Sequence, residues 1–220
     1  PGTTCVLKLE RPTADSTYIP MELKITRGTI RTNPVPYYGM VDKNIGYIAI
    51  STFAIEGCSK DIKKALIELK QQGATSIVLD LRGNGGGLLS EAVNVVNFFV
   101  PKGKEIVVTK GKIKQAGSTY KTSNEPIDME IPLTVLVDGA TASAAEIVSG
   151  SLQDLDRAVI VGNRTYGKGL VQVPRELPYN SSMKVTTAKY YIPSGRCIQA
   201  IDYAKRNADG SVARIPDSLT

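Results

Sequence analysis

Two residues of this chain could carry out covalent catalysis together. Ser143 and Lys168 lie 25 positions apart in a sequence that contains no histidine. Without an imidazole, a serine nucleophile cannot use the Ser-His-Asp arrangement and must pass its proton to another base. A lysine amine has a pKa near ~10.4, but burial disfavours the charged form and can lower that value by several units. Reaching ~7–8 requires roughly 4 kcal/mol of preference for the neutral amine.

Ser143 follows a predicted strand at 133–137 and stands near the start of a predicted helix at about 142–155. The first turn of a helix has unpaired backbone N–H groups and lies at the positive end of the helix dipole. The N–H of Ala144 is therefore a candidate oxyanion donor. Small residues keep the approach open for a peptide: Gly139, Ala140, Ala142, Ala144 and Ala145. The alternative is that Ser143 only caps the helix.

A glycine-rich loop, 83–87, lies between a predicted strand at 76–81 and a predicted helix at 89–100. Loops of this kind raise the question of nucleotide phosphates. Here Leu88 stands where GxGxxG requires its third glycine, and no GK[ST] is present. The loop does offer exposed N–H groups, one of which could complete an oxyanion hole. The alternative is a tight turn without a function.

Lys168 stands between Gly167 and Gly169. Flanking glycines allow close approach of other backbone segments and could aim the lysine side chain inward. Gln172, four residues on, shares a strand face with Lys168 if this segment is extended. Its amide oxygen could accept a hydrogen bond from the amine and orient it. The alternative is a surface lysine and glutamine in a loop.

The elements that would position these residues alternate between strand and helix, which predicts an α/β core. Hydrophobic spacing indicates strands at 45–50, 76–81, 133–137 and 158–161, and helices at 59–72, 89–100 and 142–155. Ser59 is expected to cap the first helix. Later strands at 170–173 and 183–191 are expected to extend the sheet. Strands at 6–10 and 21–26 form an edge module before the break at 33–36.

Composition fits an ordinary soluble globular protein rather than a nucleic-acid or membrane protein. The 220 residues carry a net charge of +6 with dispersed basic residues, and no apolar run approaches a membrane span. One lysine-rich segment is predicted to form a solvated edge hairpin. It contains Lys102, Lys104, Lys110, Lys112 and Lys114. The three cysteines predict neither a disulfide framework nor a zinc site: Cys5, Cys58 and Cys197. Neither terminus has the layout of a natural chain end, so we expect a segment of a longer protein.

Three segments together resemble the carboxyl-terminal processing peptidases, or tail-specific proteases, a family of Ser-Lys endopeptidases. They are Asp80-Leu-Arg-Gly-Asn-Gly-Gly-Gly87, Ser143-Ala-Ala-Glu146 and Thr165-Tyr-Gly-Lys-Gly-Leu-Val-Gln172, which resemble DLRxNxGG, SASE and TxGKGxVQ. The similarity extends from about residue 46 to residue 196. Thr141 and Ala145 depart from the family, which often has serine at these positions.

The resemblance implies a role for each matching residue. Ser143 would be the nucleophile, Lys168 the general base and Gln172 the residue that orients it. The backbone N–H groups of Ala144 and Gly86 would form the oxyanion hole. No metal or organic cofactor is implied.

The resemblance also implies an architecture and a setting. The fold would be α/β (α+β), with a core resembling the crotonase/ClpP-like fold. Residues 1–32 would hold the terminal strands of a truncated PDZ module and a linker, and 33–220 the peptidase catalytic core. Substrates would be unfolded or tail-exposed proteins with apolar C-termini, in the bacterial periplasm or another extracytoplasmic compartment. A homo-oligomer is possible, whereas nucleic-acid binding and stable membrane insertion of this segment are not expected.

Two rival interpretations remain. Ser118-Thr-Tyr-Lys121 fits the S-x-x-K of penicillin-binding-like acyltransferases, but it lies in a polar connection and no KTG follows. The second rival is a peptide-binding or scaffold relative with a disabled site. Intact Ser143, Lys168 and Gln172 argue against it, and an active-site acylating probe would decide.

Overall fold

A computed structural model describes residues 1–30, 32–113, 115 and 117–215. Lys114, which the sequence places in the lysine-rich hairpin, lies outside the described residues. The chain divides into two compact units, 1–32 and 33–220. The first unit is an antiparallel hairpin of β1 (Thr4–Pro12) and β2 (Tyr18–Thr26), and most of its side chains are exposed. A two-stranded hairpin of this kind has no core of its own.

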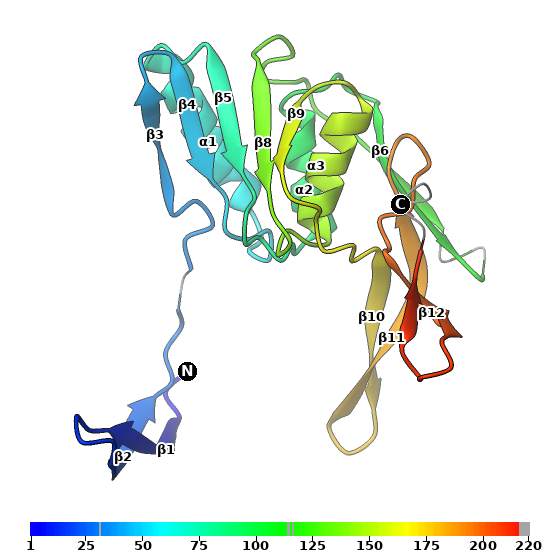
Figure 1. Ribbon diagram of the computed structural model, residues 1–220. Coiled ribbons are helices and arrows are strands. Elements are labelled where there is room, and N and C mark those ends of the chain that lie inside the picture. The colour runs from blue at the N-terminus through cyan, green and yellow to red at the C-terminus, as the bar shows by residue number, and fades with distance from the viewer. Residues whose placement is uncertain (31, 114, 116, 216–220) are drawn as a thin grey trace. The chain divides into compact units, whose positions relative to one another are not determined.

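The second unit is built on a five-stranded sheet with the order β3-β4-β5-β8-β9 (Figure 1). Its strands are β3 (Tyr37–Asp42), β4 (Ile45–Ala49), β5 (Ser76–Asp80), β8 (Leu133–Val137) and β9 (Val159–Gly162). The last four are parallel, and β3 adds an antiparallel edge. Because β5 and β8 are parallel neighbours, the glycine-rich loop and the turn that carries Ser143 leave the same edge of the sheet.

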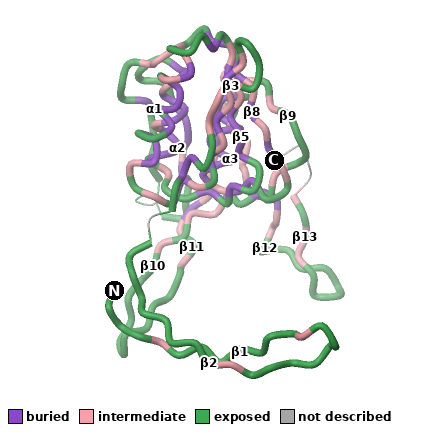
Figure 2. The backbone as a smooth tube through the Cα atoms, turned by 90° about the vertical axis from the view of Figure 1, so that its left-hand side faces the viewer, coloured by how far each residue is buried: buried purple, intermediate pink, exposed green. Residues whose placement is uncertain are grey.

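Three helices complete this α/β layer: α1 (Cys58–Gln71), α2 (Leu89–Asn97) and α3 (Ala144–Asp154). They pack in a row, α1 against α2 and α2 against α3. Ile62, Leu66 and Leu69 of α1 are fully buried, as their helical spacing predicts. Buried residues gather in these helices and the five-stranded sheet, whereas the outer part of the β10-β11 hairpin is exposed (Figure 2).

The later strands do not extend the five-stranded sheet, so that prediction is wrong. β10 (Leu170–Leu177) and β11 (Ser181–Tyr191) join β6 (Glu105–Gly111) and β7 (Ser118–Lys121) in a separate antiparallel sheet ordered β10-β11-β6-β7. The cause is the long-range pairing of β11 with β6, which local periodicity does not encode. β12 (Ile201–Arg206) and β13 (Val212–Arg214) form a further pair. The fold is therefore mixed α+β.

Ser59 does not cap α1, contrary to expectation, because the helix begins one residue earlier after Gly57. The cap is the carboxylate of Glu91 on α2. It accepts hydrogen bonds from Gly57 N at 2.9 Å and Ser59 N at 2.8 Å, and Cys58 Sγ lies 3.6 Å away. Burial opposes ionisation of Glu91, but the hydrogen bonds from Ser59, Gly57 and Cys58 outweigh it and lower its pKa.

Glu91→Gln is expected to lower the free energy of unfolding at pH 7 by about 1–3 kcal/mol, because a buried charged acceptor is lost. The wild-type carboxylate has a lower pKa in the folded chain than in the unfolded chain. Its stabilisation is therefore complete above the unfolded pKa and lost as pH falls through the folded pKa. Urea unfolding from pH 7 to pH 3 should show the two proteins converging. Glu56→Gln, at an exposed position, is the control; a difference that does not change with pH would contradict the assignment.

All three cysteines are free, and only Cys58 is buried. Within the described ranges, no group of three or more histidine, cysteine or acidic side chains is placed to hold a metal ion. No helix in this part of the chain combines the length and hydrophobicity that crossing a bilayer requires.

Candidate active site

The three motif segments meet at one edge of the five-stranded sheet. Ala142 N donates to Asn84 O at 2.9 Å, which joins the turn before Ser143 to the glycine-rich loop. Tyr166 N donates to Thr141 O at 3.0 Å, which joins the same turn to the segment that carries Lys168. Residues separated by more than 80 positions along the chain are thereby brought to one place.

Asp138 fixes the turn from the other side. Its Oδ1 accepts hydrogen bonds from Gly83 N at 3.0 Å, Ala140 N at 2.9 Å and Thr141 N at 3.0 Å. These bonds, with that from Gly83 the strongest influence, lower the pKa of Asp138. The carboxylate thus ties the glycine-rich loop to the turn that leads into α3.

Ser143 is the residue that precedes α3, and its backbone is strained. Its φ of 57° and ψ of −118° lie outside the regions that non-glycine residues prefer. Such strain persists only where the surrounding structure enforces it, and it is concentrated at functional sites. Ser143 is partly exposed, and the N–H of the following Ala144 has no hydrogen-bond acceptor among the described residues. A serine hydroxyl and a free N–H donor are therefore adjacent at a helix start.

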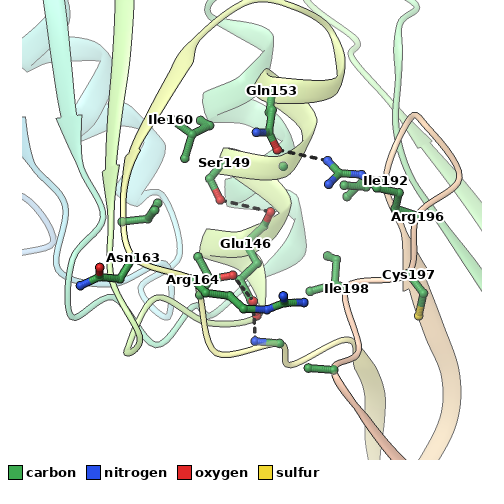
Figure 3. Close-up of a pocket in the computed structure, with 15 residues that line it drawn as sticks. Glu146, Ser149, Gln153, Ile160, Asn163, Arg164, Ile192, Arg196, Cys197 and Ile198 are labelled. Carbon is green, nitrogen blue, oxygen red and sulfur yellow. Dashed lines mark hydrogen bonds between the residues drawn. The ribbon is translucent and has the colours of Figure 1, made fainter. Parts of the chain in front are cut away.

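Glu146 links the two candidate catalytic residues. Glu146 is 4% exposed, and its Oε2 accepts hydrogen bonds from Ser143 N and from Lys168 N, each at 2.8 Å. Because both bonds end on one oxygen, the two nitrogens can be no further apart than twice that distance. Oε1 accepts from Thr165 Oγ1 at 2.7 Å and Gly167 N at 2.6 Å, and Figure 3 shows the carboxylate between α3 and this loop.

Sequence reasoning gave Glu146 no role beyond its place in the motif. The Ser-x-x-Glu spacing of Ser143 and Glu146 is the pattern of a capping box, in which the glutamate accepts the N–H of the capping residue. That spacing could have indicated the bond to Ser143. The three bonds to residues 165–168 come from another part of the chain and carry no local signal.

Gly86 lies directly against Ser143 and Ala144. Its φ is 92°, and a Cβ at this position would lie 2.8 Å from both Ala144 N and Ser143 Cβ, so only glycine fits. The N–H of Gly86, however, donates to Asn84 Oδ1 at 2.9 Å. Asn84 is fully buried, and its Nδ2 donates to Ile50 O at 2.8 Å. The expected oxyanion role of Gly86 therefore requires that the bond to Asn84 give way.

The glycines around Lys168 are explained by close backbone approach. A Cβ on Gly167 would lie 2.2 Å from Ala200 Cβ, and one on Gly169 would lie 2.3 Å from Gln199 N. Ala200 N donates to Gly167 O at 3.0 Å, and Gly169 N donates to Gln199 Oε1 at 2.9 Å. The segment just before β12 thus contacts the Lys168 loop in addition to Glu146.

The side chain of Lys168 is exposed, which differs from the inward orientation that the flanking glycines suggest. The close approach at Gly167 and Gly169 constrains the backbone, and the side chain of Lys168 between them extends into solvent. Lys168 and Gln172 line one pocket of about 210 Å³. No hydrogen bond joins Lys168 Nζ to Ser143 or Gln172 within the described structure, and Gln172 Nε2 makes a long contact of 3.4 Å with Thr186 Oγ1.

A separate pocket of about 300 Å³ lies behind Glu146 (Figure 3). α3 contributes Glu146, Ser149 and Gln153 to its lining, and Arg164 and Arg196 approach from the facing segments. Neither Ser143 nor Lys168 lines it. The pocket therefore adjoins the residue that links the candidate pair but is not where a scissile bond would lie.

Comparison with known proteins places the chain in a peptidase family. Residues 44–204 match the model of peptidase family S41, and the chain belongs to this family. The resemblance predicted from the three motifs is confirmed. The chain is 40% identical over 195 residues to a carboxyl-terminal-processing protease of Picosynechococcus sp., covering 87% of this chain and 45% of that protein.

Two further comparisons agree. The carboxy-terminal processing protease CtpA of Bacillus subtilis is 36% identical over 197 residues, covering 90% of this chain and 41% of that protein. The solved structure of a photosystem II D1 C-terminal processing protease superposes with a TM-score of 0.68 at 33% identity, covering 90% of this chain and 53% of that one. The chain thus spans less than half the length of these two curated relatives.

Glu146→Gln is expected to lower kcat about 10–100-fold with a smaller change in KM. The substitution replaces one acceptor oxygen with an NH₂ group, which cannot accept the N–H donors that it faces. The Lys168 loop is therefore expected to shift. Steady-state kinetics on a peptide substrate would measure this. Glu91→Gln is the matched control, a buried carboxylate outside the site that should reduce stability and leave kcat of the folded protein unchanged. Equal kcat values for Glu146→Gln and wild type would show that the link has no catalytic role.

Proposed function

We propose that this chain contains the catalytic core of a serine endopeptidase that cleaves protein substrates near their C-termini. The observation that carries the proposal is the Glu146 carboxylate, which accepts N–H donors from both Ser143 and Lys168. The strained backbone of Ser143 and the free N–H of Ala144 support it, as does the family of the chain. The disabled-scaffold alternative finds no support in these residues, all of which are intact.

In the proposed mechanism, the neutral amine of Lys168 removes the proton of Ser143 Oγ as that oxygen attacks the scissile carbonyl carbon. The N–H of Ala144 stabilises the oxyanion, and Gly86 supplies the second donor once its bond to Asn84 is released. The lysine ammonium then protonates the departing amine, which leaves an acyl-enzyme. Water, deprotonated by the same lysine, hydrolyses the ester and restores Ser143. Gln172 orients the amine in both half-reactions.

Substrate binding has a further role in this scheme. Lys168 is exposed in the free chain, so water surrounds its amine before a substrate arrives. A peptide that covers the pocket of Lys168 and Gln172 would exclude water there and favour the neutral amine. The outer edge of β10 has no partner strand among the described residues, and an extended substrate would pair along it.

The finer features of the family resemblance remain part of the proposal. The core of residues 33–220 would be crotonase/ClpP-like, and the hairpin of residues 1–32 would close a PDZ module. The substrates would be unfolded or tail-exposed proteins with apolar C-termini. The compartment would be extracytoplasmic, and the protein could assemble as a homo-oligomer.

The test is to incubate the chain with an unfolded protein that has an apolar C-terminal tail and to identify the products by mass spectrometry. Fragments that end at a few sites near the C-terminus are expected. An otherwise identical substrate with a charged tail is the control and should be cleaved more slowly. An intact substrate, with a chain that also fails to react with an acylating probe, would favour the disabled scaffold.

A further inference from the structure

A groove leads away from Lys168 between the β10-β11 hairpin and β12. The pocket that holds Lys168 and Gln172 continues into a second one of about 540 Å³. Both pockets are lined by the same four residues, Leu170, Gln172, Ile201 and Tyr203. The second pocket adds Thr186, Lys189, Asp202 and Ala204, and it is open to solvent. The shared residues join the two pockets into one groove, whose walls combine apolar side chains with polar and charged ones.

A β-bulge brings Lys189 to the face of this groove. Gln172 pairs with Thr186 while the preceding residue of β10 pairs with Ala188, so Thr187 is an extra residue in β11. Side chains three positions apart on a regular strand point to opposite faces. The extra residue restores a common face, and both Thr186 and Lys189 therefore line the groove. Bulges redirect side chains beside active sites in this way.

Lys189 is partly buried and faces a like charge across the sheet. It pairs directly with Lys110 of β6 across the sheet, an arrangement in which like charges repel. Lys110 Nζ lies 4.7 Å from the centre of the Tyr191 ring, but no ion pair of the described residues includes Lys189. Asp202 lines the groove too, where its Oδ1 accepts from Ala204 N at 3.1 Å. An anion in the groove would relieve the repulsion between the two lysines.

We propose that this groove binds the substrate on one side of the scissile bond and that Lys189 selects an acidic side chain there. The inference rests on the proposed peptidase function and specifies its substrates. Leu170, Ile201 and Tyr203 provide apolar contacts for the neighbouring residues. Because the groove is open, the chain can continue past Lys189, which suits an aspartate or glutamate side chain better than a chain end. Charge complementarity of this kind sets specificity and register.

The test uses peptides that differ only by glutamate, glutamine or lysine at one position, and this position is moved stepwise across the cleaved bond. The wild type should prefer glutamate at one position by about tenfold in kcat/KM, the size expected for a hydrogen-bonded charge pair. Lys189→Met should abolish the preference, and Lys189→Glu should reverse it toward lysine at the same position. The preference should also weaken as salt is added.

Lys184→Met is the matched control. Lys184 lies on the same strand and has the same charge, but it pairs with Pro174 and does not line the groove. It should retain the full preference. Equal loss of kcat/KM on all peptides in Lys189→Met would overturn the inference and leave the peptidase function standing. The inference would also be overturned if Lys189 favoured peptides with a free C-terminal carboxylate over the same peptides with a C-terminal amide. A wild type that cleaves none of the peptides and no unfolded protein would overturn both.

Discussion

Ser143→Ala should lower turnover by several orders of magnitude while the chain remains folded. The substitution removes the only atom that can form the acyl-enzyme, and loss of one member of a catalytic unit costs nearly as much as loss of the whole. The bond from Ser143 N to Glu146 uses the backbone and survives the change. Circular dichroism and the unfolding midpoint should stay close to wild type, and kcat/KM on the unfolded substrate should fall toward the uncatalysed rate.

Ser149→Ala is the control for this variant. Ser149 lies on the same helix, is buried, and donates to Ala145 O at 3.1 Å. Its replacement should change activity only slightly. A comparable loss of activity in Ser149→Ala, together with full activity in Ser143→Ala, would show that Ser143 is not the nucleophile.

Lys168→Arg should lower kcat on the order of 10²–10⁴-fold, the usual contribution of a general base. Arginine keeps the positive charge and most of the stem, but it cannot give up a proton at any workable pH. The backbone bond from position 168 to Glu146 is retained, so the loop should stay in place. The wild-type rate should rise with pH along a single ionisation limb, and this limb should be absent in the variant.

Lys184→Arg, on the exposed part of β11, controls for the exchange of lysine for arginine and should behave as wild type. An arginine variant at 168 that keeps most of its activity would mean that Lys168 acts only as a fixed charge.

Local patterns predicted the α/β layer well because short-range forces form it. The spacing of Ile62, Leu66 and Leu69 placed α1, and alternating strands and helices placed the parallel sheet. The pairing of β11 with β6 joins residues about 80 positions apart, and the local sequence of neither strand identifies its pairing partner. Local periodicity therefore predicts the wrong sheet for the later strands.

The site shows the same division. The glycines beside Lys168 correctly indicated close backbone approach, but they could not identify residues 198–200 as the segment that approaches. Nor could they show that this contact leaves the lysine side chain exposed. The bond from Gly86 to Asn84 likewise depends on the loop conformation, which composition does not determine.

The most direct test of the Ser143–Lys168 assignment is labelling with a serine-reactive fluorophosphonate, followed by intact mass measurement and peptide mapping. The wild-type chain should gain one label on Ser143, at a rate that rises with pH. Lys168→Arg should react far more slowly, and Ser143→Ala should not react. A label on another serine, or equal rates in wild type and Lys168→Arg, would contradict the proposed catalytic pair.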